Sequence, residues 1–250
     1  MIQHAWHFYH ALVSVLKCHA SAWSLRASHL NRALATLWKG QMKRFYEIST
    51  VVEGMPPVNT NFPCNTESAI NLVIVCESPS TDEVTIGFPT VSSTGAKIFK
   101  NLVRAKMLES EVLTYSFDDH YLDFALNGIY LTNLVRYQAD LGIKDDRSAK
   151  DSKVRRLWSS KKHQLFEELE LISKKYPKSP VLIACGASFE SQIVEVAKKA
   201  DELGMPWFVT SHPSRSKKMH AQNYNPANWE KRDIPKTKLM EKIEYKLKRS

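Results

Sequence analysis

A short apolar segment that ends abruptly in a polar turn is the feature that most constrains this fold. Residues 72–75 are all apolar, and the turn 77–80 that follows begins with Glu77. A second loop, 87–95, leads into a stretch with helical apolar periodicity that starts near Ala96. The pattern predicts a buried strand with a carboxylate at its C-terminal end, and then a helix opened by small residues. In open α/β sheets, ligand chemistry collects at this position.

The same strand-then-helix pattern recurs along the rest of the chain. The predicted strands are 72–76, 129–132, 181–185 and 207–210, and the predicted helices between them are 94–108, 151–175 and 187–203. Alternating strands and helices favour parallel strands joined by right-handed crossovers. We therefore expect a three-layer α/β/α domain with a central four-stranded parallel sheet. The segment 216–235 is expected to be irregular, and 236–249 to form a basic terminal helix.

The α/β pattern occupies residues 70–250 and leaves an N-terminal part of different composition. Residues 1–50 are rich in Ala, Leu, Trp and His and contain no proline, which predicts a helical extension. We interpret it as a helical cap on the core, with an additional surface for nucleic acid or a partner as the alternative. Residues 51–69 contain three prolines and several Asn and Thr, which is typical of a linker.

Length and hydropathy favour a cytoplasmic protein, which we expect to be a monomer. A chain of 250 residues can form one sizeable α/β domain with additions. No apolar segment approaches the ~20 residues that cross a bilayer. The N-terminal apolar patch 11–16 is interrupted by Ser14 and has no small-residue cleavage site after it, so we predict neither a signal peptide nor a membrane anchor.

The four cysteines, Cys18, Cys64, Cys76 and Cys185, lie far apart in the sequence. None forms a C-x-x-C pair, so the spacing indicates neither zinc nor a metal cluster. Cys76 and Cys185 fall at strand ends and are interpreted as small buried thiols. We expect no cofactor.

The formal net charge of +9 is concentrated in two regions. Residues 147–162 contain seven Lys or Arg and one acidic residue, Asp151, and the tail from Ser211 contains eleven basic and four acidic residues. Clustered positive charge is typical of phosphate binding. Taken alone, either cluster is equally consistent with a solvated face that aids solubility.

Four blocks in sequence order, the first of them spanning 76–95, resemble motifs of the uracil-DNA glycosylase superfamily. Residues 76–80 (Cys-Glu-Ser-Pro-Ser), followed by the acidic pair 82–83, are similar to a Gly-Glu-Ala-Pro-Gly first motif, and 87–95 resembles the Gly-x-Pro-Phe-Val-Gly-x-x-Gly loop of the same branch. IYLTNLVRY (129–137) is similar to the strand that ends in a base-recognising asparagine, VLIACGAS (181–188) to a strand-Gly-helix unit, and VTSHPSR (209–215) to the closing His-Pro-Ser motif. The resemblance spans about residues 70–216 and makes DNA contact the better interpretation of the basic clusters.

The resemblance implies roles for individual residues. Glu77 would stabilise an oxocarbenium-like transition state and orient or deprotonate water. His212 would donate to the O2 atom of the leaving pyrimidine. Base contacts are implied for Asn133, Ser78, Phe88 and Thr90, and DNA-backbone contacts for Ser93, Ser214, Arg215, Lys217 and Lys218. Outside the motif, Glu77 would more often cap a loop, His212 would more often be structural, and Asn133 would cap a turn.

Two departures from the branch carry information. Its closely spaced N-terminal cysteine pair is missing, so its iron–sulfur cluster is not expected here. Thr90 occupies the position of an aromatic residue that stacks on uracil, a contact worth ~1–3 kcal/mol. The small residues 90–94 then leave room for, and can hydrogen-bond, a polar substituent on the base, unless Phe88 supplies the ring instead.

These departures favour a monofunctional glycosylase for a bulky modified pyrimidine. One such base is the glucosylated hydroxymethylcytosine of some viral genomes, which would make the chain similar to anti-viral defence glycosylases. The alternatives are ordinary uracil excision and a DNA-binding module that does no turnover or traps DNA covalently. A nucleotide-binding α/β protein is disfavoured because the chain has neither G-x-G-x-x-G nor a P-loop.

Overall fold

The described part of the chain is organised around one parallel sheet. The computed structural model describes residues 70–80, 83, 93–108, 124, 127–137, 147–215, 218–231 and 234–249. All of these belong to the second of the two units into which the chain divides, Thr50–Ser250. The predictions for residues 1–50 and 51–69 lie outside the described residues.

Four strands form the sheet: β1 (Leu72–Cys76), β2 (Ile129–Asn133), β3 (Val181–Ala184) and β4 (Trp207–Thr210). Their spatial order is β2-β1-β3-β4, and all three pairings are parallel. Most strand side chains are fully buried, as expected for a parallel sheet whose two faces are both covered. The predicted α/β class and the four-stranded parallel sheet are confirmed.

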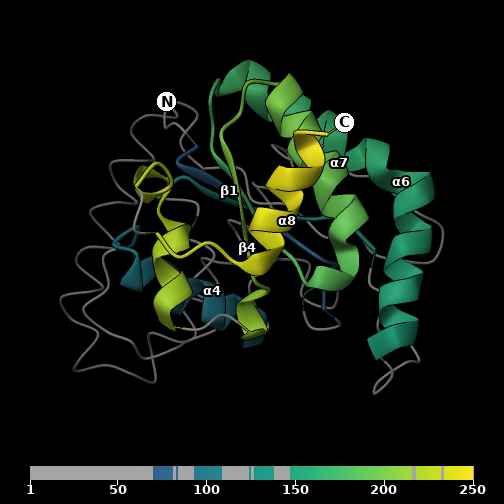
Figure 1. The fold of residues 1–250 in the computed structure, drawn as a ribbon, viewed down its shortest axis with the longest axis horizontal. Coiled ribbons are helices and arrows are strands. Elements are labelled where there is room, and N and C mark those ends of the chain that lie inside the picture. The colour runs from purple at the N-terminus through teal and green to yellow at the C-terminus, as the bar shows by residue number, and fades with distance from the viewer. Residues whose placement is uncertain are drawn as a thin grey trace, which may run out of the picture. The chain divides into compact units, whose positions relative to one another are not determined.

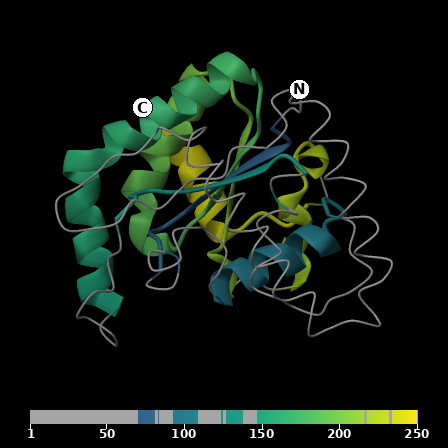
Figure 2. The same ribbon diagram turned by 180° about the vertical axis from the view of Figure 1, so that it is seen from behind.

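Helices cover both faces of this sheet (Figures 1 and 2). One face is covered by α4 (Ser93–Arg104), and the other by α6 (Arg147–Lys175), α7 (Glu190–Glu202) and α8 (Lys238–Leu247). The right-handed crossover rule explains this division. The chain moves one way from β1 to β2 and the opposite way from β2 to β3 and from β3 to β4, so α4 must lie on the face opposite α6 and α7.

Helix ends depart from the predicted ranges for local reasons. The helix expected at 94–108 stops at Arg104, because Lys106 adopts a left-handed φ of 59° and the Met107 amide donates back to the Leu102 carbonyl at 2.9 Å. The helix expected at 151–175 begins earlier, at Arg147, in a polar stretch with no apolar periodicity. The helix expected at 187–203 starts as a 3₁₀ turn, Ala187–Phe189, before α7.

The expectation that 216–235 is irregular is wrong for residues 218–224 and 226–228. The segment contains the 3₁₀ helices Lys218–Tyr224 and Pro226–Asn228, and the first of these packs against α4. A further 3₁₀ turn, Pro213–Arg215, lies between them and β4 and also packs against α4. The terminal helix α8 begins after Thr237, whose hydroxyl accepts a hydrogen bond from the Met240 amide.

Helix α8 is fixed to the start of α7 by ion pairs. Lys242 and Lys246 both pair with Glu190, the first residue of α7. Lys236 pairs with Glu244 of α8 at 2.7 Å. Among the described residues, no helix is both long and apolar enough to cross a membrane.

Candidate functional site

The candidate site lies where the strand order reverses. The chain leaves β1 toward β2 on one side and leaves β3 toward β4 on the other, and β1 and β3 are neighbours. In open α/β sheets, the crevice beyond the carboxyl ends of two such strands is the usual ligand position. Glu77 follows β1 and Gly186 follows β3 at this edge.

The Glu77 carboxylate is held by the backbone of the neighbouring strand end. Gly186 N–H donates to Glu77 Oε1 at 2.9 Å, and the Glu77 residue is only 7% exposed. A Cβ on Gly186 would lie 3.0 Å from Glu77 Oε1 and 3.5 Å from Arg147 Nη2. The φ of −76° at Gly186 suits any residue, so this close approach, and not backbone strain, is what favours glycine here.

The turn that follows Glu77 is fixed by a reciprocal capping interaction. Ser80 N–H donates to Glu83 Oε2 at 2.7 Å, and Glu83 N–H donates to Ser80 Oγ at 3.3 Å. Glu83, the second residue of the acidic pair that follows residues 76–80, therefore stabilises the turn. Ser78, which was predicted to contact the base, has a buried Oγ with no hydrogen-bond partner among the described residues.

His212 faces the second carboxylate oxygen. It follows β4, its side chain is 14% exposed, and its Nε2 lies 4.0 Å from Glu77 Oε2. Its Nδ1 lies 3.2 Å from Ser214 N and 2.7 Å from Ser214 Oγ. Because a backbone N–H can only donate, Nδ1 must accept, and in the neutral ring the proton sits on Nε2. The ring therefore presents an N–H donor on the side of Glu77.

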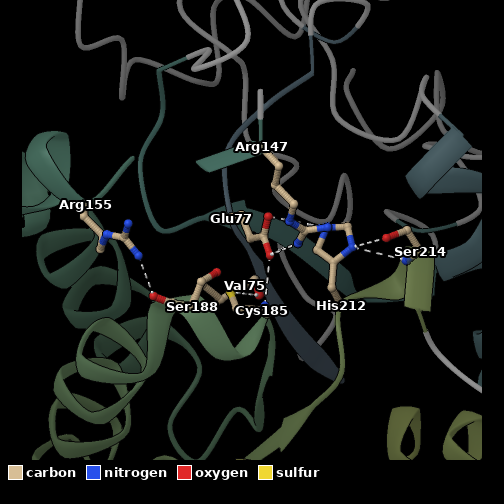
Figure 3. A network of polar contacts seen from close by, with 9 residues as sticks. Val75, Glu77, Arg147, Arg155, Cys185, Ser188, His212 and Ser214 are labelled. Carbon is tan, nitrogen blue, oxygen red and sulfur yellow. Dashed lines mark hydrogen bonds and ion pairs between the residues drawn. The ribbon is translucent and has the colours of Figure 1, made fainter. Parts of the chain in front are cut away.

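Arg147 completes the site and was not singled out in the sequence. It is the first residue of α6, and its Nη2 lies 4.0 Å from Glu77 Oε1. Figure 3 shows the Arg147 and His212 side chains both directed at the Glu77 carboxylate. In the sequence, Arg147 was one of seven basic residues in a cluster, and no spacing rule connected it to a carboxylate 70 positions earlier. Only the β2–α6 crossover brings it to this edge.

Burial is the largest influence on the charge of Glu77. Desolvation raises the pKa of its carboxyl above the ordinary value of 4.5, and the nearby Asp151 raises it further. The Gly186 amide, Arg147 and Lys150 act in the opposite direction but do not cancel the burial effect. A carboxylate with a raised pKa is a stronger base toward water than an exposed one.

Asn133 is the last residue of β2 and lies next to Cys76 in the sheet register. The backbone after Asn133 stays hydrogen-bonded to the end of β1, since Leu134 N–H donates to Cys76 O at 2.8 Å. Tyr130 and Thr132 both donate to Glu168 of α6. Since side chains alternate along a strand, Asn133 points to the opposite face, which α4 covers. The structure thus places Asn133 at the same edge as Glu77.

The other predicted contact residues are placed as follows. Ser93 is the exposed first residue of α4, and Ser214 is exposed beside His212. Phe88, Thr90 and Lys217 lie outside the described residues, as do the side chains of Arg215 and Lys218.

Several residues of the two basic clusters are engaged within the protein. Arg155 donates to the Ser188 carbonyl at 3.1 Å, and Lys162 pairs with Glu195 at 2.7 Å. In the tail, Lys242 and Lys246 pair with Glu190. These cations stabilise helix packing, so the net charge of each cluster overstates what is available to a phosphate backbone.

The two described cysteines adjoin the site as thiols. Cys185 is buried, and its Sγ lies 3.6 Å from Val75 O, whereas the Cys76 residue keeps some exposed surface although its thiol is desolvated. Burial raises the pKa of both thiols, which disfavours the reactive thiolate. Within the described part of the chain, no group of His, Cys, Asp and Glu is placed to hold a metal ion.

Ser214, His212 and Glu77 lie in the order of a hydrolase triad, but their geometry fits that chemistry poorly. The 4.0 Å between His212 Nε2 and Glu77 Oε2 exceeds a hydrogen bond. The Nδ1 lone pair that would take the serine proton already accepts the Ser214 backbone N–H. The arrangement instead offers a buried carboxylate and a separate N–H donor, both at the sheet edge.

In comparisons with known proteins, no protein-family model and no curated protein matches this chain.

Proposed function

We propose that this protein is a DNA glycosylase, which hydrolyses the N-glycosidic bond of an extruded pyrimidine nucleotide and leaves an abasic site. One observation carries the proposal. Glu77 lies at the reversal point of a parallel sheet, with one carboxylate oxygen held by Gly186 N–H and the other facing His212 Nε2. This pairing of a carboxylate with an opposed donor matches the two charges that develop when a base leaves a sugar.

Glu77 would act on the sugar side of the bond. As the base departs, positive charge builds up at the anomeric carbon in an oxocarbenium-like transition state. A fixed carboxylate stabilises that charge and orients or deprotonates the attacking water. The Gly186 contact supports this role, because it orients the carboxylate before the substrate arrives.

His212 would act on the base side. Anionic charge accumulates on O2 of the departing pyrimidine, and a donor directed at that atom lowers the barrier. The neutral ring, with its proton on Nε2, is suited to this role without carrying a net charge. Ser214 supports this role because its backbone N–H donates to His212 Nδ1 at 3.2 Å, which keeps the proton of the neutral ring on Nε2.

Asn133 would recognise the base, and the rim residues would hold the DNA backbone. An amide side chain offers a donor and an acceptor, which together match a pyrimidine edge. Ser93, Ser214, Arg215, Lys217 and Lys218 are assigned to phosphates, contacts that position DNA without selecting sequence. Extruding the nucleotide brings the bond to Glu77.

For the substrate, we favour a bulky modified pyrimidine such as glucosylated hydroxymethylcytosine, with a role in defence against viral DNA. This choice depends on Thr90, where the resembling branch has an aromatic residue. Uracil excision is the alternative substrate. A DNA-binding module without turnover, or one that traps DNA covalently, is the alternative function.

The test is single-turnover excision from matched duplexes that carry uracil, hydroxymethylcytosine or its glucosylated form, with alkali used to cleave abasic sites. Glu77→Gln should lower the rate by at least about a hundredfold, the usual scale for a positioned acid–base group, while keeping DNA affinity. Glu167→Gln, the same change at an exposed position on α6, is the matched control. If Glu77→Gln excises at the wild-type rate, the assignment of Glu77 is wrong.

The same assay separates the remaining alternatives. Thr90→Phe should block the glucosylated base and improve any uracil activity; efficient uracil excision by the wild type, with the glucosylated base ignored, would establish ordinary uracil repair instead. Base release from none of the duplexes, with DNA binding retained, would identify a binding module. Protein that stays attached to DNA on a denaturing gel would identify covalent trapping.

A further inference from the structure

Arg147 covers Glu77 in the protein without DNA. Its guanidinium lies 4.0 Å from Oε1, the oxygen that Gly186 also binds, while His212 faces Oε2 at 4.0 Å (Figure 3). With these three neighbours in place, the Glu77 side chain is only 9% exposed. The carboxylate is therefore largely closed to a ligand in this arrangement.

The three neighbours differ in their freedom to move. Gly186 contributes a backbone amide at the end of β3, between the strand and the 3₁₀ turn Ala187–Phe189. His212 is 14% exposed and is held from behind by Ser214. Arg147 is 46% exposed and reaches the site through a long, flexible side chain. Arg147 is therefore the neighbour that can leave at the lowest cost.

Electrostatics also favours its departure once DNA is bound. A guanidinium beside Glu77 would oppose the positive charge that the carboxylate must stabilise on the sugar. A DNA phosphate offers the planar guanidinium two oxygens, so the two groups can form a pair of parallel hydrogen bonds. The exposed Arg147 lies at the edge where a bound DNA backbone would pass.

We infer that Arg147 is a positioning residue that changes partner, from the Glu77 carboxylate in the free protein to a backbone phosphate in the DNA complex. This inference rests on the proposed function, since it takes DNA as the ligand of this site. The exchange uncovers the carboxylate only when DNA is present, and it uses one cation first to keep Glu77 oriented and then to bind the strand.

The exchange removes one of several charges around Glu77. Lys150 and Asp151 act on its pKa from α6. The His212 ring faces it from the end of β4, and the thiols of Cys76 and Cys185 lie near it at the ends of β1 and β3. These groups are the same in the free protein and in an Arg147 variant. A change in the titration of Glu77 on replacing Arg147 therefore reports on that one contact.

The experiment compares Arg147→Gln and Arg147→Lys with Lys174→Gln. Lys174 is exposed near the other end of α6, about 40 Å away at the rise of a helix, and its replacement removes the same charge. DNA affinity is measured against salt concentration with a duplex that carries a stable tetrahydrofuran abasic analogue. The Glu77 carboxyl is titrated by carbon NMR, and its signal is assigned by its loss in Glu77→Gln.

In the expected result, Arg147→Gln lowers the slope of log affinity against log salt by about 0.9, the effect of one lost phosphate contact, and Arg147→Lys retains that slope. Arg147→Gln also raises the pKa of Glu77 in the free protein, and DNA binding raises it in the wild type. In Arg147→Gln the DNA concentration that gives half-maximal excision increases. This increase, as a fold-change, is several times larger than the decrease in the excision rate at saturating DNA. Lys174→Gln leaves the titration of Glu77 as in the wild type.

Contrary outcomes separate the exchange from the proposed function. If Arg147→Gln lowers the saturating excision rate and keeps the wild-type salt slope, Arg147 is a fixed partner of Glu77 and the exchange is wrong, although the protein is a glycosylase. If the salt slope depends on Arg147 but no base is released from any duplex, the exchange stands and the proposed function fails. If the wild type binds no DNA, both are wrong.

Discussion

The Glu77 carboxylate accepts a 2.9 Å hydrogen bond from the Gly186 amide across a separation of 109 residues. This contact joins the ends of β1 and β3, the two strands from which the chain departs in opposite directions. It leaves Oε2 toward His212, so the carboxylate has a single orientation before any ligand binds.

Replacing Gly186 with alanine should disrupt this orientation. The added methyl would lie 3.0 Å from Glu77 Oε1, closer than an ordinary van der Waals contact, so the carboxylate must shift by a few tenths of an ångström. We expect excision to fall, but by less than the loss of about a hundredfold that follows removal of the acid–base group itself. The control is Gly204→Ala, since Gly204 has a φ of +66° and open space around it. That variant should lose about 1–2 kcal/mol of unfolding free energy while keeping its excision rate.

Glu77→Gln should stabilise the protein near neutral pH. Because burial raises the pKa of Glu77 above 4.5, the folded state holds its proton more tightly than the unfolded state does. At a pH below the pKa of the unfolded state, Glu77 is protonated in both states, so its ionisation does not lower the free energy of unfolding. As pH rises above 4.5, its ionisation destabilises the fold, and glutamine avoids this. Denaturant unfolding of both proteins across that range should show a stability difference that grows with pH; a constant difference would contradict the burial argument.

Replacing His212 separates the glycosylase assignment from triad hydrolysis. His212→Ala should lower single-turnover excision by about 10²–10³, the effect of removing one oxyanion donor. Ser214→Ala should lower it by less than about tenfold, because the backbone N–H that fixes the His212 ring remains. Loss of all activity in Ser214→Ala, together with ester hydrolysis by the wild type, would instead indicate a nucleophilic serine.

Glu168→Ala should destabilise the protein strongly. Its side chain is fully buried, pairs with Arg136 at 3.0 Å, and accepts hydrogen bonds from Tyr130 and Thr132. Removing it takes the ion pair with Glu168 away from the largely buried Arg136, at a cost of about 3–5 kcal/mol. The exposed neighbour Glu167→Ala is the control, expected to stay within about 0.5 kcal/mol of the wild type by urea denaturation.

The sheet could be predicted from sequence because each strand is short, apolar and bounded by polar turns. The predicted strand 72–76 and its parallel neighbours are confirmed within a residue of each boundary. Helix starts were harder, because a basic N-terminal turn such as 147–150 carries no apolar period. The 3₁₀ helices of 218–228 were missed because such short turns have little periodicity of their own.

The candidate site could be predicted only in part. Glu77 and His212 each follow a strand, so the rule for parallel sheets places both at one edge. The role of Gly186 depends on which strands are neighbours, and that of Arg147 on where α6 begins. Local sequence patterns predict neither the strand order nor the start of this helix. The Thr90 side of the site stays a prediction, since it lies outside the described residues.

The ion pairs between α8 and Glu190 make the C-terminal helix a support for the site. Lys242 and Lys246 hold the first residue of α7, and α7 begins one 3₁₀ turn after Gly186. A chain that ends before Lys238 would keep every residue assigned to catalysis. It would lose the ion pairs of Lys242 and Lys246 with Glu190, next to the turn that presents the Gly186 amide. Fragments designed around the strand motifs alone would therefore carry the chemistry without the scaffold that aligns it.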